Sequence, residues 1–284
     1  MAWLYLLLSA GCSLLIAHLL KVCEHRQMRT LPTLTVNYLV AAAIALALDP
    51  LAGSVLHTLF TPLPLIFCAL TGAFFILNFV LYSKSVHLNG VGVTVAAMRV
   101  SLFFPVLLSL AVYRESLTTL KGAGIAGVFF ALLLLVPKRS RSWIRGVDAG
   151  WMLAGIFLLT GLADSALKVY QEEFGGVFGE VQFMGMIFLS AFLIGLVMLA
   201  IRRSAWPRPR EVVLGALIGL PNLYSGVFLI RALRGMDGAV AFPAVNALIV
   251  LGGTLLGLAV WKDRVSRRQW AGIVLAILAM ALLL

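Results

Sequence analysis

Hydrophobic positions in this chain run on in long stretches and do not alternate with polar ones. Apolar runs of about 20 residues, the length that crosses ~30 Å of hydrocarbon, recur along the whole sequence. Short polar or proline-containing links separate them, and the least regular link, at 49–62, is compatible with a segment lying along the membrane interface. We predict ten membrane-spanning helices, at 2–21, 32–48, 63–83, 91–112, 119–136, 148–168, 178–200, 211–231, 238–260 and 269–284.

Composition supports this pattern. Hydrophobic residues make up 62% of the 284 positions and charged residues only 12%, with a mean hydropathy of +1.05. A soluble protein has about 25% charged residues, so this chain could not cover a water-exposed surface. The fold class is therefore an all-α integral membrane protein, and its first helix is expected to be retained and not removed as a signal peptide.

The second half of the sequence resembles the first. Leu110-Ala111-Val112-Tyr113-Arg114-Glu115 is matched 148 residues later by Leu258-Ala259-Val260-Trp261-Lys262-Asp263. Ala123-Gly124-Ile125 and Ala271-Gly272-Ile273 continue this register, in which Arg99 aligns with Ala247 and Met98 with Asn246. Leu20-Lys21-Val22 and Leu167-Lys168-Val169 match at a spacing of 147, and Gly72 and Gly219 also correspond. We interpret residues 1–137 and 148–284 as two copies of one five-helix unit.

An odd number of helices per copy fixes how the copies are related. If the first copy starts on one side of the membrane, the second must start on the other. The two repeats are therefore expected to be inverted about an axis in the membrane plane, as in many secondary transporters.

Basic residues predict the orientation. The first, third, fifth, seventh and ninth loops with their adjoining helix ends hold 16 Lys and Arg residues, whereas the termini and the even loops hold 5. Because cytoplasmic loops are enriched in Lys and Arg, the odd loops are expected in the cytoplasm and both termini outside, in a multi-pass protein of the cell inner (plasma) membrane. The same clustering explains the net charge of +11 without a nucleic-acid partner.

Several segments resemble the drug/metabolite transporters of the EamA type. The aromatic–basic–acidic turns that end the two copies carry the resemblance, together with the stretches before them and the opening of the chain. These segments are Tyr113–Gly124, Trp261–Gly272, Val95–Ser101 with Pro105, Ala241–Asn246, and Tyr5–Ser9 through Asn37-Tyr38.

Membership of this family implies ten helices in a pseudo-symmetric five-plus-five arrangement. It also implies a central cavity that opens alternately to either side, but no particular substrate. Better-known members keep both termini in the cytoplasm. The Lys and Arg distribution of this chain predicts the opposite orientation.

Arg99 is the first candidate for a substrate-binding residue. It lies about eight residues into the fourth predicted span, roughly 12 Å deep at ~1.5 Å per residue. A charge at that depth costs several kcal/mol unless it faces a wet cavity or a partner. The guanidinium suits an anionic or carboxylate-bearing solute. The alternatives are a structural ion pair and snorkelling toward the third loop.

Two titratable residues in the spans are candidates for coupling transport to protons. Asp164 could pair with Arg99, carry a proton, or face interfacial water. His18 lies at a similar depth in the first span, and its near-neutral pKa suits proton coupling. The alternative for His18 is a hydrogen-bonded packing role.

Amide and phenol side chains supply further candidates inside apolar helices. Because buried polar groups need partners, these side chains either bind a polar solute or bond to neighbouring helices. Pro221 and Pro243 would free backbone carbonyls beside two of them, which is tolerated where a cavity is lined. The candidates are Asn78, Asn222, Tyr224 and Asn246, with Asn37 and Tyr38 weaker.

Other positions have structural interpretations. The spaced glycines at 122, 124 and 127 and at 253 and 257 are expected to allow close helix packing, with dimerisation second. Glu115 and Asp263 are expected to cap the next helix or to pair locally. Cys12, Cys23 and Cys68 fit neither a disulfide framework nor metal-ligand spacing.

Together these features favour a secondary transporter of a small polar organic solute. There is no G-x-S-x-G, H-E-x-x-H or Walker A sequence, so we expect no enzyme, metal site, cofactor or ATP-driven pump. Expected partners are a small-molecule substrate and membrane lipids, with the chain a monomer or homodimer. The alternative is a flippase or exporter of a lipid-linked or amphipathic substrate, favoured if a lateral opening carries Arg231 and Arg234 at its mouth.

Overall fold

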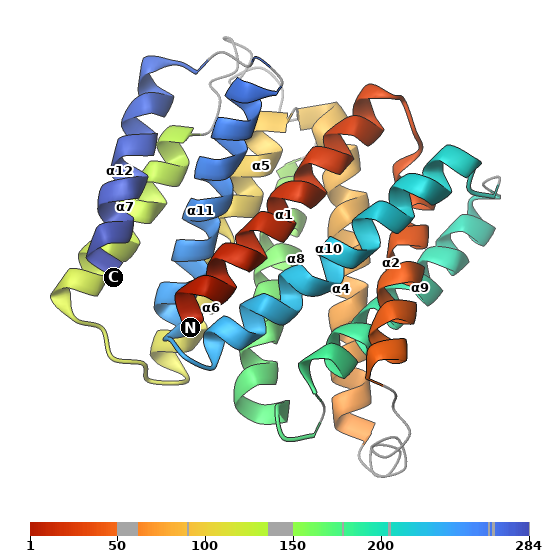
Figure 1. Ribbon diagram of the computed structural model, residues 1–284, viewed down its shortest axis with the longest axis horizontal. Helices are drawn as coiled ribbons and strands as arrows, with labels where there is room; N and C mark the ends of the chain where they lie inside the picture. Colours follow the sequence, from red (N-terminus) through yellow and green to blue (C-terminus); the bar gives the residue numbers. More distant parts are fainter. Residues whose placement is uncertain are drawn as a thin grey trace.

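The computed structural model describes residues 1–49, 62–89, 91–135, 150–177, 179–203, 206–260, 262 and 265–283. All regular elements in these residues are helices, as predicted (Figure 1). Eight helical segments among them are long and apolar enough to span a membrane. This confirms a multi-pass, all-helical membrane protein. The exact count of ten spans stays a prediction, and most of the 49–62 link lies outside the described residues.

The described residues of the first half form six helices. They are α1 (Ala2–His25), α2 (Thr30–Leu48), α4 (Pro62–Asn89), α5 (Val91–Val100), α6 (Phe103–Ala111) and α7 (Thr119–Leu135).

The predicted fourth span is broken into α5 and α6 at Ser101 and Leu102. Pro105 explains the break, because proline has no N–H to donate to the carbonyl four residues earlier and its ring crowds that carbonyl. The Ser101 carbonyl instead accepts a hydrogen bond from the Phe104 N–H at 3.0 Å. The Ser101 hydroxyl donates to the Met98 carbonyl at 2.6 Å. The break begins two residues after Arg99.

The second half has one wide helical turn in addition to its five helices. They are α8 (Gly150–Val169), the π-helical turn η2 (Tyr170–Phe174), α9 (Glu180–Ile201), α10 (Pro209–Leu233), α11 (Gly238–Ala259) and α12 (Arg267–Leu283). Pro221 and Pro243 lie inside α10 and α11, which continue through them. The prolines therefore do not split these helices as Pro105 splits the fourth span.

Helices of the two halves pack against one another throughout the molecule. The pair α7 and α12 forms one edge of the view in Figure 1, and the pair α2 and α9 lies toward the opposite edge. Between them, α1 packs against α10, and α4 packs against α8 and α9. The extensive contacts between halves mean that neither half forms its own closed core.

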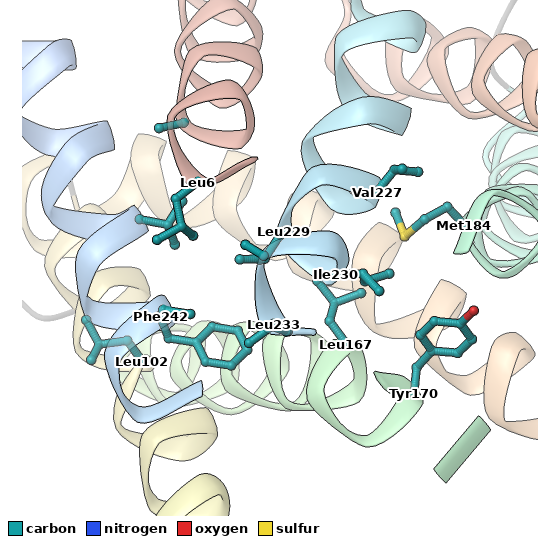
Figure 2. Close-up of a cluster of buried hydrophobic side chains, with 14 of the residues drawn as sticks. Leu6, Leu102, Leu167, Tyr170, Met184, Val227, Leu229, Ile230, Leu233 and Phe242 are labelled. Carbon is teal, nitrogen blue, oxygen red and sulfur yellow. The ribbon is translucent and has the colours of Figure 1, made fainter. Parts of the chain in front are cut away.

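One buried apolar cluster connects these helices. Figure 2 shows side chains from α1, α8, α9, α10 and α11 in this cluster, including Leu6, Leu167, Met184, Ile230 and Phe242. Each of these five residues is buried. The core thus draws on both halves.

Large apolar side chains are also exposed on the outer faces of the helices. Examples are Phe130 on α7, Val197 on α9, Leu217 on α10 and Ile277 on α12, each more than half exposed. Contiguous exposed apolar surface is unfavourable in water. These faces are suited to contact with lipid chains.

Two glycines permit close crossings between the halves. A Cβ added at Gly72 in α4 would lie 2.5 Å from the Ile187 carbonyl oxygen of α9, and one at Gly219 in α10 would lie 2.8 Å from Val40 of α2. Gly124 and Gly127 of α7 meet α12 in the same way. The predicted packing role is confirmed for Gly124 and Gly127, whereas the only contact of a Cβ at Gly122 with a described residue would be with Leu117 at 3.9 Å.

Candidate functional site

Arg99 and Asn246 form a direct contact between the two halves. Arg99 is in the last turn of α5, and its Nη1 donates a hydrogen bond of 2.7 Å to Oδ1 of Asn246 in α11. The Asn246 amide nitrogen donates to the Phe242 carbonyl at 3.0 Å, which fixes the orientation of the amide. A hydrogen bond from a charged donor is stronger than one between neutral groups. Two of the predicted site residues are therefore adjacent.

Arg99 also has polar neighbours on two other helices. Asp164 of α8 and Tyr82 of α4 interact with it electrostatically. The Arg99 Nε is buried and has no hydrogen-bond partner among the described residues. Arg99 thus keeps an unused donor beside a carboxyl group and a phenol. This arrangement can accept a polar group that brings its own acceptor.

The other amide candidates bond to neighbouring helices. Asn78 of α4 accepts a hydrogen bond of 3.0 Å from the Thr160 hydroxyl of α8. Asn222 of α10 donates one of 3.2 Å to Oδ1 of Asn37 in α2. The Asn37 amide nitrogen is buried without a partner in the described part of the chain. These contacts match the helix-packing interpretation and do not join Asn78 or Asn222 to Arg99.

Tyr224 and His18 lie on the side of the molecule formed by α1 and α10. The Tyr224 ring centroid is 5.4 Å from that of Phe228, which in turn stacks on Tyr5 of α1 at 6.2 Å. His18 is a half-buried residue of α1, a helix that packs against α10 and α11. Tyr224 therefore belongs to an aromatic row between two helices.

A second polar cluster, which the sequence did not predict, ties the halves together near the start of α11. Lys168, at the end of α8, is 2% exposed, and its Nζ lies 2.8 Å from Glu115 Oε1 and 2.6 Å from Glu172 Oε1. The two Glu115 oxygens also accept hydrogen bonds of 2.8 Å from the Gly238 and Ala239 N–H groups. Glu115 was expected to cap the next helix, α7, or to pair locally; in these residues it instead caps α11 and pairs with the distant Lys168.

The sequence contained a clue to this cluster, Lys168 at the end of an apolar span, but we interpreted it only as part of the internal repeat. Lys168 is the match of Lys21, and it precedes Glu172 by four residues, a spacing that pairs side chains on a helix. Its partner Glu115 is 53 positions away along the chain, so no local pattern could connect them. A lysine at the end of an apolar span was the available clue.

Two cavities open at the helix ends. One, of about 310 Å³, is lined by Met1, Ala2, Tyr5, Arg231, Arg234 and Gly235. The other, of about 350 Å³, lies among the ends of α2, α4 and α9. Arg99 and Asn246 line neither of them. The described residues contain no group of three His, Cys, Asp or Glu side chains able to hold a metal ion.

Comparisons with known proteins establish the fold but not a family. No family model matches the chain. A protein of Haemophilus influenzae described as uncharacterized is 26% identical over 282 residues, covering 94% of this chain and 93% of its own length. A crystal structure of another protein superposes with a TM-score of 0.72 at 16% identity and covers 98% of this chain and 95% of its own. The whole architecture thus recurs elsewhere.

Proposed function

We propose that this protein is a secondary transporter that binds a small polar organic solute between two inverted five-helix halves. The observation that carries the proposal is the Arg99–Asn246 contact, which places a half-buried charge, with a buried and unused Nε donor, beside a helix break between the halves. Charged residues inside membrane spans mark substrate or ion pathways. Broken helices near the midplane are typical of binding sites in transporters with inverted repeats.

Helix packing supports the inverted repeat. The first helix of each half packs against the third helix of the other, as α1 with α10 and α8 with α4. The second helix of each half does the same, as α2 with α10 and α9 with α4. Matched helices also pack on each other, as α2 with α9 and α7 with α12. A twofold axis between the halves would produce this exchange of partners.

Backbone conformation supports the same duplication. Arg114 and Lys262, which are 148 residues apart, have φ values of 51° and 55°. Non-glycine residues rarely adopt positive φ, so its occurrence at both matched turns is a shared feature. Gly72 and Gly219 likewise serve matched crossings, α4 with α9 and α10 with α2.

The contact itself supports a site on the axis between the halves. Arg99 and Asn246 are 147 residues apart, the same spacing as Gly72 and Gly219. At this spacing Arg99 would correspond to Asn246, whereas the spacing of 148 between Arg114 and Lys262 aligns Arg99 with Ala247. Two equivalent residues can touch only at the twofold axis. The equivalent positions differ chemically, which makes the proposed site asymmetric.

The proposed solute carries an acceptor such as a carboxylate. Its acceptor would bond the Arg99 guanidinium, and Asn78, Asn222, Tyr224 and Asn246 would line the path or the site. His18 and Asp164 would carry coupling protons, with Asp164 placed by its interaction with Arg99. The proposed location is the inner (plasma) membrane with both termini outside.

A thermal-shift screen of the purified protein against a metabolite library tests the site. We expect a stabilising solute whose effect is lost in Arg99→Ala and in Asn246→Ala, and kept in Arg26→Ala, which changes an exposed arginine in the loop before α2. Uptake or efflux of that solute in proteoliposomes should likewise be lost in Arg99→Ala and Asn246→Ala and kept in Arg26→Ala. If both site variants transport at the wild-type rate, the proposed site is wrong.

The lipid-linked alternative has one observation in its favour. A cavity between the start of α1 and the end of α10 is lined by Arg231 and Arg234. Both guanidinium groups are ion-paired with Glu180, at 2.7 and 2.6 Å, which uses much of their charge. Transport of a fluorescent lipid across vesicles that contain the protein, with no solute hit in the screen, would favour this alternative.

A further inference from the structure

The cavity among α2, α4 and α9 has an unusual lining for the end of a helix bundle. Three basic side chains, Arg29, Lys84 and Arg202, line it, and no acidic residue does. They come from the first, third and seventh loops or the adjoining helix ends, so they gather on one face. The hydroxyl-bearing residues Thr30 and Ser83 also line the cavity.

The charges of these three side chains are not equally available. Arg29 is held by Glu211, with Nη2 2.7 Å from Oε2 and Nε 2.9 Å from Oε1. Lys84 and Arg202 are exposed and form no ion pair with any described residue. The arginines of the other cavity are both paired with Glu180. Of these two cavities, the one at α2, α4 and α9 therefore carries positive charge that no described residue compensates.

The rest of the lining is apolar. Leu31, Leu34, Phe79 and Val80 lie beside the basic groups in the same cavity. An amphipathic lining of this kind fits a ligand with an anionic head and an apolar portion. Basic pockets between membrane helices bind anionic lipid headgroups.

We propose that this cavity is a binding site for an anionic phosphate group, with Lys84 and Arg202 as its principal ligands. The volume of about 350 Å³ exceeds that of a phosphate, and the apolar residues leave room for the start of an acyl chain. The guanidinium of Arg202 provides paired donors to phosphate oxygens, and Lys84 provides a point charge. The site is separate from Arg99 and does not depend on the proposed transport activity.

Thermal shift and native mass spectrometry of the purified full-length protein in detergent test the proposal. The probes are short-chain phosphatidylglycerol, short-chain phosphatidylcholine and inorganic phosphate. We expect saturable stabilisation by phosphatidylglycerol. Its apparent affinity should fall roughly fivefold for Lys84→Gln or Arg202→Gln and about thirtyfold for the double variant, because each basic group near an anionic headgroup contributes on the order of a fivefold gain.

Arg203→Gln is the matched control, since Arg203 adjoins Arg202, is exposed and does not line the cavity. It should bind phosphatidylglycerol as the wild type does. An equal response to inorganic phosphate would identify a soluble phosphate compound as the ligand and support the same site. Equal stabilisation by phosphatidylcholine, or equal affinity in the double variant and the control, would overturn the proposal.

Discussion

At the scale of single residues, the central feature is a charged guanidinium held by a neutral amide. Asn246 accepts from Arg99 but brings no negative charge, so it stabilises the arginine without neutralising it. Asp164 supplies opposite charge from a third helix. In the proposed transporter, a solute carboxylate would meet a guanidinium whose nearest hydrogen-bond partner can be displaced.

Replacing Asn246 by alanine should destabilise the protein in the absence of solute. The change removes an acceptor from a charged donor, which costs about 1–3 kcal/mol where the donor stays buried. Arg99→Met should remove most of that cost, so the double variant should be more stable than the sum of the single effects predicts. Unfolding in detergent at a series of denaturant concentrations gives the free energy of unfolding of the wild type, the two single variants and the double variant, which together form a double-mutant cycle. Strict additivity would show that the contact does not contribute to stability.

The sequence was sufficient to find Arg99 and Asn246 separately but not to pair them. A charge and an amide in apolar spans stand out against their neighbours, because burial there is costly. Which helices bring them together depends on packing between segments 147 residues apart. Asn78 and Asn222 stood out in the same way, and the structure pairs each of them with a neighbouring helix.

At the scale of elements, the start of α11 is secured by a residue from the other half. Helix N-termini leave N–H groups without intrahelical partners, and an acidic side chain there satisfies them and interacts favourably with the helix dipole. Glu115 serves the first two residues of α11 and also pairs with Lys168. The sequence predicted that Glu115 caps the next helix or pairs locally, and both alternatives were wrong, since sequence patterns of this kind are local and these contacts are not.

Glu115→Ala should lower the free energy of unfolding by at least about 2 kcal/mol, because it removes a cap and one partner of a buried ion pair. Lys121→Met is the control. Lys121 forms a 2.6 Å ion pair with Asp237 beside the same helix, but both side chains are about one-third exposed, so its loss should cost less than about 1 kcal/mol. Equal melting temperatures for the two variants would contradict this assignment.

At the scale of the whole molecule, the long apolar runs predicted an all-helical membrane protein, because crossing the hydrocarbon requires about 20 consecutive apolar residues. They did not predict the break in the fourth span, where a proline three residues beyond Leu102 prevents regular hydrogen bonding. The distribution of Lys and Arg residues predicts how the protein is oriented across the membrane, which the arrangement of its helices does not define.

Single cysteines introduced into a variant without Cys12, Cys23 and Cys68 test that orientation in intact cells. Because the odd loops carry most of the basic charge, Gln27→Cys and Arg203→Cys should react with an impermeant thiol reagent only after the cells are opened. Ser116→Cys and Gly235→Cys should react without opening. The reverse pattern would place both termini in the cytoplasm.

Glu115 of the first half contacts both Lys168 and the start of α11 in the second half. Separating the two halves on that face therefore requires the free energy needed to break these contacts. Separating them would remove Glu115 from Lys168, which would keep Glu172 and Gln171, and would uncap two N–H groups, at a cost of several kcal/mol. A transporter meets such a cost with binding energy from its solute. The rate of turnover would then depend on how much affinity the solute gains in the opened state, so the tightest ligand of the closed state need not be the one carried fastest.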